Sequence, residues 1–314
     1  MTGASRKARI ALRDMTPQDI EGIQDWVGTT WAWGTYSPVA FDEWLADPCS
    51  VVRVAVMPDG LIVGVQHYQR LDPYQCWLSG LRVHPNHRGE GIATRLLKDA
   101  IEIARHDGLK VLRYATEAVH EAIHYLSETI ALEPRGTWLS FERSMDAATC
   151  ELRRTRSALG AVMLPLSHSD KVRALPLLLA SGRHFYVHGW AWRTLDDAVL
   201  TSLVERNQAF FSRSDLGGWS LSLLGSQDDS GLEATLYGTD AASVQTALEH
   251  VTQIACESEG TTITIHVPQH GPAAGLMVDL ARRGEWRHSV ERALRIWECD
   301  LTRVRPPRVR RGAA

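Results

Sequence analysis

The chain has 314 residues and a formal net charge of −3, and 44% of its residues are apolar. At roughly 150 residues per domain, this length predicts two globular domains, each with enough apolar content for its own core. The charge gives no overall basic surface for nucleic acid, and residues 1–10 lack the apolar segment of a secretory signal. No later apolar run is long enough to span a bilayer, so we expect a cytoplasmic protein that binds neither nucleic acid nor membrane.

Strand and helix signals alternate along the first half of the chain. Thr16-Pro-Gln-Asp starts a helix with a capping hydroxyl, a proline in the first turn and an acid soon after. Two apolar strands flank Pro58-Asp-Gly, a hairpin turn in which Gly60 supplies the required backbone angle. The predicted strands cover 9–13, 51–56, 61–68, 76–83, 110–115 and 137–143, and the predicted helices cover 41–46, 93–106 and 120–130.

The most informative segment is the turn between strand 76–83 and helix 93–106, with the sequence Val83-His-Pro-Asn-His-Arg-Gly-Glu-Gly-Ile-Ala. Gly89 and Gly91 permit positive φ angles and a close approach of the backbone to a ligand. The unpaired N–H groups of the first helical turn point toward the same place, and Arg88 adds a positive charge. This combination predicts a pyrophosphate-binding turn.

The order strand, V-x-P-x-x-R-G-x-G-I-A, helix resembles the signature of the GNAT superfamily of acyl-CoA-dependent N-acyltransferases. The resemblance implies an α/β (α+β) fold with a mixed, mostly antiparallel sheet flanked by helices. It also implies a splayed parallel strand pair whose amides hold coenzyme A and polarise the thioester, with acetyl-CoA as co-substrate. The implied cofactor-binding residues are Leu81, Val83, Arg88, Gly89, Glu90, Gly91, Ile92 and Ala93.

The second half of the chain repeats the first in outline. Strand 232–237, helix 244–258 and strand 262–267 match the elements on either side of the pyrophosphate turn. Between them, Asp240 takes about the place of Arg88, and no glycine stands where Gly89 and Gly91 stand. A carboxylate repels a pyrophosphate, so we expect this half to bind no coenzyme A. An unrelated α/β domain is the alternative.

These patterns predict two tandem GNAT-like domains. The expected boundaries are 1–148 for a catalytic domain, 149–160 for a linker, 161–302 for a degenerate domain and 303–314 for a basic, disordered tail. The five cysteines are odd in number, widely separated and without a C-x-x-C pair, which argues against a disulfide framework and a structural zinc site. The cysteines are Cys49, Cys76, Cys150, Cys256 and Cys299.

The sequence leaves the proton-transfer groups open. An alkyl amine is almost wholly charged at neutral pH and needs a base or a desolvating pocket to react. The resemblance implies a Glu on the strand and a Tyr on the last helix, but these positions hold Ser79 and Ser127. Glu117 and His120 are the candidates for relaying a proton through water, although either could be a surface residue or a helix cap. His67 and Tyr68 are weaker candidates.

A second motif competes with this interpretation. His120-Glu-Ala-Ile-His124 matches H-E-x-x-H, in which two imidazoles bind zinc and Glu121 activates water. The motif falls where the last helix of a GNAT domain begins, its third ligand would have to be Glu128 or Glu142, and a zinc hydrolase would leave the glycine turn unexplained. We therefore expect no metal and keep the hydrolase as a minor alternative.

Tryptophan residues suggest the acceptor side. Trp26, Trp31, Trp33 and Trp44 fall in the segment that forms the acceptor side of the cleft in GNAT folds. Core packing is their commonest role. As an aromatic wall they would hold an acceptor amine, with Trp31, Trp33 and Glu43 binding the substrate.

Two functions follow from the sequence. The first is an acetyltransferase that acts on a primary amine of a small molecule, such as an amino acid, by direct attack in a ternary complex. The second is a non-catalytic acyl-CoA-binding module, suggested by Ser79 and Ser127. We expect a monomer or a homodimer.

Overall fold

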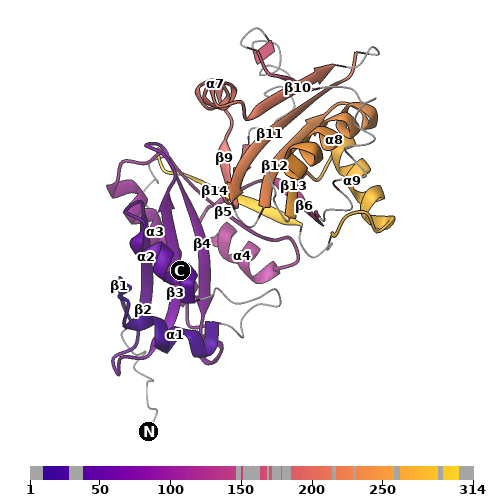
Figure 1. Cartoon of the computed structure of the whole chain (residues 1–314). Coiled ribbons are helices and arrows are strands. Elements are labelled where there is room, and N and C mark those ends of the chain that lie inside the picture. Colours follow the sequence, from indigo (N-terminus) through magenta and orange to yellow (C-terminus); the bar gives the residue numbers. More distant parts are fainter. Residues whose placement is uncertain are drawn as a thin grey trace, which may run out of the picture. The chain divides into compact units, whose positions relative to one another are not determined.

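The computed structural model describes residues 10–27, 38–145, 150, 163–167, 170–171, 178, 185–213, 217–228, 231–257, 262–288 and 293–303. The chain divides into two compact units (Figure 1). Unit 1 contains residues 1–115, 122–133 and 297–314, and unit 2 contains residues 116–121 and 134–296. Among the described residues, no helix is long and apolar enough to cross a membrane.

The first part of the chain forms the predicted elements with shifted ends. Asp19 supplies the acidic half of a capping box at the start of the first helix, because its carboxylate accepts hydrogen bonds from the Thr16 amide and hydroxyl at 2.7 and 2.9 Å. Gly60 takes a φ of +91° in the first hairpin turn, as predicted. The elements are β1 (Ala11–Asp14), α1 (Asp19–Val27), α2 (Pro38–Ala46), β2 (Ser50–Val56), β3 (Ile62–Arg70), β4 (Gln75–Val83), the 3-10 turn η1 (Pro85–His87), α3 (Ile92–His106), β5 (Val111–Glu117) and α4 (Glu121–Thr129).

The sheet of unit 1 has the strand order β1-β2-β3-β4-β5. The first four strands are antiparallel to their neighbours, and β4 and β5 are parallel. Tyr68 of β3 packs with α3, whereas Val65 of the same strand packs with α1 and α2. Side chains alternate across a strand, so α3 covers one face of this sheet and α1 and α2 cover the other.

The end of the chain completes the core of unit 1. Strand β14 (Leu294–Asp300) lies next to β5, and the Leu301 amide donates a hydrogen bond to the Lys110 carbonyl. Trp297 is 1% exposed and belongs to the same apolar cluster as Leu97 of α3. The expected boundary at residue 148 therefore differs from the compact units, because residues distant in sequence build the core of unit 1.

Unit 2 repeats the central topology. Its sheet has the order β6-β13-β12-β11-β10-β7, with β11 and β12 antiparallel and β12 and β13 parallel, as in β3, β4 and β5. Helix α8 connects β12 to β13, as α3 connects β4 to β5, and packs on β11 and β12 (Figure 1). The repeat predicted from the sequence is confirmed.

The remaining described elements are β6 (Glu133–Ser144), β7 (Leu164–Pro165), β8 (Phe185–His188), β9 (Ala191–Thr194), α7 (Asp197–Glu205), β10 (Ala209–Arg213), β11 (Trp219–Asp228), β12 (Gly231–Gly238), α8 (Ala241–Glu257), β13 (Thr262–Pro268) and α9 (Pro272–Arg282). Strands β8 and β9 form a separate hairpin.

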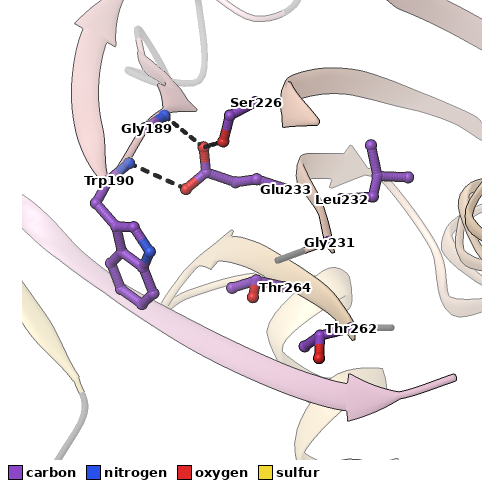
Figure 2. Close-up of a pocket in the computed structure, with 8 residues that line it drawn as sticks. All are labelled: Gly189, Trp190, Ser226, Gly231, Leu232, Glu233, Thr262 and Thr264. Carbon is purple, nitrogen blue, oxygen red and sulfur yellow. Dashed lines mark hydrogen bonds between the residues drawn. The ribbon is translucent and has the colours of Figure 1, made fainter. Parts of the chain in front are cut away.

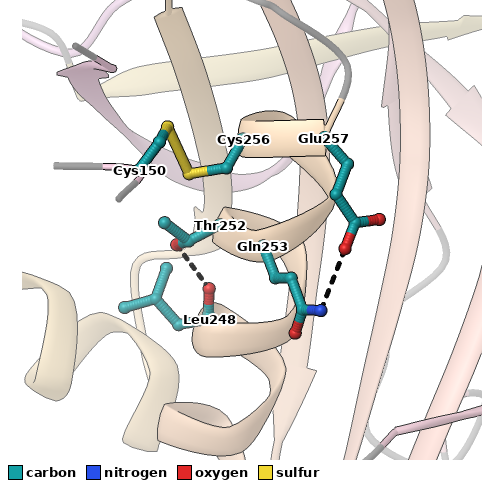
Figure 3. The surroundings of a disulfide bond; sticks show 6 residues. All are labelled: Cys150, Leu248, Thr252, Gln253, Cys256 and Glu257. Atoms are coloured by element: carbon teal, nitrogen blue, oxygen red, sulfur yellow. Dashed lines mark hydrogen bonds between the residues drawn. A yellow bond between two sulfur atoms is a disulfide. The ribbon is translucent and has the colours of Figure 1, made fainter. Parts of the chain in front are cut away.

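One pair of cysteines departs from the expectation of no disulfide framework. Cys150 and Cys256 form a disulfide, and Figure 3 shows it at the last turn of α8. The two residues are 106 positions apart, and only the fold brings them together, so their sequence spacing carries no signal of the pairing. Cys49, Cys76 and Cys299 are free.

Candidate functional site

Strand β4 is irregular at the point where it leaves its parallel partner. Its pairing with β5 covers Gln75–Leu78 and Val111–Tyr114. Immediately after this stretch, Gly80 has a φ of +65°, and the register between β3 and β4 shifts by one residue. Such a bulge bends a strand and re-aims its side chains and amides. Leu81 and Val83 therefore lie in the part of β4 that has separated from the β5 register.

The predicted glycine angles are present in the turn after β4. Gly89 and Gly91 have φ values of +81° and +80°, and no other atoms lie within 4 Å of the position that a Cβ would take at either residue. Arg88, Gly89 and Glu90 are exposed. The turn is thus open at both glycines and carries an exposed cation, and such a backbone can accept an anion.

Helix α3 begins directly at this turn. Gly91 is its N-cap residue and makes no side-chain hydrogen bond to the first amides of the helix. Ile92 is buried at 1% exposure and anchors the helix to the sheet, while Ala93 is half-buried. The first-turn amides and the helix dipole thus favour an anion at the same place as the glycine turn.

Four polar side chains form a continuous hydrogen-bonded chain beside the bulge. The Ser79 hydroxyl lies 2.8 Å from His67 Nδ1, and His67 Nε2 lies 2.9 Å from the Ser50 hydroxyl. Ser50 donates to Asp47 Oδ2 at 2.7 Å. Trp44 of α2 stacks on the His67 ring at 4.2 Å between centroids. Sequence reasoning ranked His67 low, because the pairing of His67 with Ser79 across β3 and β4 depends on a register that the sequence does not show.

The environment keeps the His67 ring neutral. Burial lowers the pKa of His67 to about 4, against an opposing effect of the Asp47 carboxylate. The hydrogen bond from Ser50 lowers the pKa of Asp47 below its ordinary value. At neutral pH this chain of groups therefore contains a neutral imidazole and an ionised carboxylate.

Glu117 and His120 belong to unit 2, whereas the glycine turn belongs to unit 1. Glu117 Oε2 lies 3.1 Å from His120 Nε2, and the two side chains are 6% and 39% exposed. The structure thus brings these two candidates to each other.

Ser127, at the position where the resemblance implies a Tyr, is fully buried in α4. Its hydroxyl donates to the Ile123 carbonyl at 2.6 Å and is hydrogen-bonded to the Tyr114 hydroxyl from β5. Burial raises the pKa of Tyr114 to about 12. The serine therefore fills a packing position in the helix.

The two histidines of the H-E-x-x-H motif have separate hydrogen-bond partners. His120 precedes α4, which begins at Glu121. His124 Nδ1 accepts a hydrogen bond from the Trp297 indole at 3.1 Å, inside unit 1. Within the described ranges, no group of three or more His, Cys, Asp or Glu side chains is arranged to hold a metal ion.

The predicted acceptor residues are only partly described. Trp31 and Trp33 lie outside the described residues. Glu43 is exposed on α2, and Trp26 is 5% exposed in the core of unit 1. Among these tryptophans, Trp44 lies next to the bulge of β4: its ring stacks on His67, and a Cβ at Gly80 would lie 3.0 Å from it.

The corresponding turn of unit 2 holds its own anion. The Asp240 carboxylate accepts from the Ser243 amide at 2.8 Å and from its hydroxyl at 2.7 Å, and these hydrogen bonds lower the pKa of Asp240. Gly238 is closely packed, since a Cβ there would meet Val244 at 2.4 Å. A carboxylate thus occupies the N-terminus of α8, where a pyrophosphate would have to lie.

Unit 2 has a pocket elsewhere, beside the hairpin of β8 and β9 (Figure 2). Glu233 accepts hydrogen bonds there from the Gly189 and Trp190 amides, Ser226 and His266. Burial opposes ionisation of Glu233, but these hydrogen bonds outweigh it and lower its pKa to about 2. The four donors use the four acceptor positions of the carboxylate, so Glu233 holds the hairpin to the sheet.

The fold and the turn define a class of protein. It has an α/β fold in which a bulged strand separates from a parallel partner and leads through a glycine turn into a helix. Residues 20–128 match the model of the acetyltransferase (GNAT) family. Residues 20–128 are thus a GNAT acetyltransferase domain.

Two solved structures share the fold over most of the chain. A proposed acetyltransferase from Thermoplasma acidophilum has a TM-score of 0.54 and 16% identity, with 92% of this chain and 99% of that chain covered. A GCN5-related N-acetyltransferase from Sphaerobacter thermophilus has a TM-score of 0.53 and 14% identity, with 93% and 96% covered. No curated protein matched the sequence.

Proposed function

We propose that unit 1 is an acetyl-CoA-dependent N-acetyltransferase that acetylates a primary amine of a small molecule by direct attack in a ternary complex. The observation that carries this proposal is the sequence of bulge, separated strand and glycine turn on β4 and α3. The GNAT family, whose model matches here, uses acetyl-CoA. Holding a thioester and an amine together can supply much of the rate enhancement.

The proposed roles follow the geometry. Gly89, Gly91 and the first amides of α3 hold the pyrophosphate, and Arg88 at the rim neutralises its charge. The amides of Leu81 and Val83 hold the pantetheine arm and polarise the thioester carbonyl, which stabilises the negative charge that develops on its oxygen. Glu117 and His120 stay the sequence-based candidates for the proton path, and Glu43 with Trp31 and Trp33 for binding the amine.

Thiol release tests the proposal. The full chain is incubated with acetyl-CoA and pools of free amino acids and alkyl amines, and the released thiol and the acetylated product are measured. We expect release that depends on one class of amine, with the acetyl group on nitrogen. Calorimetric binding of acetyl-CoA without amine-dependent release from any pool would favour the non-catalytic module.

A further inference from the structure

The geometry points to a proton relay inside unit 1 that begins at Ser79, passes through His67 and ends at the Asp47 carboxylate. Ser50 lies between His67 and Asp47 in this chain. Ser79 is the group that takes the proton from the acceptor amine. The inference rests on the proposed function, because the relay acts on an amine that attacks a thioester.

The directions of these hydrogen bonds follow from the Asp47 carboxylate, which can only accept. An ionised carboxylate has no proton to donate, so the Ser50 hydroxyl gives its proton to Asp47, 2.7 Å away. The Ser50 oxygen must then accept from His67 Nε2 at 2.9 Å. A neutral imidazole carries one ring proton, so Nδ1 is an acceptor and takes the Ser79 hydroxyl proton at 2.8 Å.

Ser79 is the end of this chain of groups that lies next to the separated part of β4. It is half-buried, whereas His67 is 3% exposed beneath Trp44. It follows Leu78, the last β4 residue paired with β5, and precedes the bulge at Gly80. With its proton directed at His67, the Ser79 oxygen has lone pairs left for an N–H group.

The proton transfer balances as follows. The ammonium group first loses one proton to water. The neutral nitrogen then forms a bond to the thioester carbon, the carbon–sulfur bond breaks, and its electron pair leaves on sulfur. The proton on nitrogen becomes acidic as the new bond forms and moves to Ser79 Oγ, while the Ser79 proton moves to His67 Nδ1. The imidazolium is stabilised by Asp47 through Ser50, and it returns the proton through water to the thiolate.

Nitrogen NMR of the full chain, labelled at histidine, tests the relay without any acceptor. We expect His67 at pH 7 to be neutral with its proton on Nε2, and we expect Ser79→Ala to shift the Nδ1 resonance. The matched control is Ser140→Ala. Ser140 lies 2.8 Å from His266 Nδ1 in unit 2, so the variant breaks the same kind of hydrogen bond elsewhere. An Nδ1-protonated or charged His67 at pH 7 overturns the relay.

Kinetics with the best amine from the thiol-release pools give the second test. We expect Ser79→Ala to lower kcat about 100-fold at pH 7, the lower range for general base catalysis, with unchanged calorimetric affinity for acetyl-CoA. The loss should shrink at high pH, where hydroxide can take the proton from the attacking nitrogen in place of Ser79. Ser79→Thr keeps the hydroxyl and should restore most of kcat, and Ser140→Ala should leave kcat unchanged.

The possible failures are distinguishable. A wild-type chain that acetylates an amine while Ser79→Ala keeps full kcat overturns the relay and leaves the proposed function standing. So does a loss of kcat confined to Glu117→Gln, or a covalent acetyl group on Ser79 after incubation with acetyl-CoA alone. A wild-type chain that acetylates nothing overturns the proposed function, and the NMR result then decides the hydrogen-bond order by itself.

Discussion

Gly91 has a backbone angle that residues other than glycine adopt only with strain. Its φ of +80° starts α3, and the space around a Cβ at this position is empty. A substitution there costs about 1–3 kcal/mol of backbone strain, the range for a residue other than Gly in the left-handed region. We expect a substituted chain to relieve this strain by changing the backbone of the turn and not the packing of the core. The substitution should therefore alter the geometry of the turn.

We therefore expect Gly91→Val to abolish acetyl-CoA binding while the protein stays folded. The measurement is calorimetric titration with acetyl-CoA, combined with a circular dichroism melt. Gly108→Val is the matched control, because Gly108 has a φ of +74° and equally open surroundings at the other end of α3. Unchanged affinity in a folded Gly91→Val protein, or an equal loss in Gly108→Val, would refute the assignment of the turn.

Local and non-local features differ in how well the sequence predicts them. The angles of Gly89 and Gly91 could be predicted, because a turn between a strand and a helix depends on neighbouring residues. The contact of His67 with Ser79 could not, because it depends on the register of β3 against β4 and on the bulge at Gly80. The buried state of Ser127 likewise depends on Tyr114 from a different element.

At the scale of elements, the segment from β4 to α3 was predicted with its order and nearly its bounds. The strand expected over 76–83 is Gln75–Val83, and the helix expected over 93–106 is Ile92–His106. The strand expected over 137–143 is longer, Glu133–Ser144; β13 pairs with Trp138–Ser144, and β14 is the other neighbour of this strand in the sheet. Periodicity identifies an element, but its partner in the sheet sets its length.

The disulfide at the end of α8 is an element-scale feature with a measurable effect. Cross-linking residues 106 positions apart removes chain entropy from the unfolded state, worth about 4 kcal/mol in the chain-entropy model. We expect a reducing agent, or Cys256→Ser, to lower the melting temperature of the full chain. Cys49→Ser is the control, because Cys49 is a free cysteine.

Alkylation followed by mass spectrometry checks the same bond directly. Cys150 and Cys256 should be protected until reduction, and an unprotected pair with no effect of reductant on melting would contradict the disulfide.

At the scale of the whole molecule, the two units share one central topology but differ in the turn that precedes α3 in unit 1 and α8 in unit 2. Unit 1 has open glycines at positive φ, and unit 2 has Asp240 bonded to the start of α8. Calorimetry should therefore give one acetyl-CoA per chain. Asp240→Asn removes the charge but leaves the close packing at Gly238 and should keep the stoichiometry at one. A stoichiometry of two for the wild type would overturn the contrast between the units.

The composition of unit 1 predicts how the chain responds to division at residue 148. A fragment of residues 1–148 lacks Trp297 and Glu298, which are the partners of His124 and Arg113 inside unit 1. Removing one partner of a buried ion pair costs about 3–5 kcal/mol, and Arg113 and Glu298 are 4% and 8% exposed.

We expect this fragment to be poorly folded and to aggregate, as measured by circular dichroism and gel filtration. Co-expression with residues 149–314 should restore a soluble complex that binds acetyl-CoA. A monomeric 1–148 fragment with cooperative unfolding and full turnover would contradict the role of the terminal strand.

The return of the chain's end to unit 1 also has a consequence for synthesis on the ribosome. In the sequence, unit 1 is interrupted between residue 133 and residue 297. At roughly 5–20 residues per second, translation of this interval takes about 10–30 s. During this interval the nascent unit 1 has β5 as an exposed strand edge that awaits β14, and such an edge is a template for pairing with other chains. Yield of the protein should therefore depend on translation speed and on chaperones that bind nascent chains, more than the stability of the finished molecule would suggest.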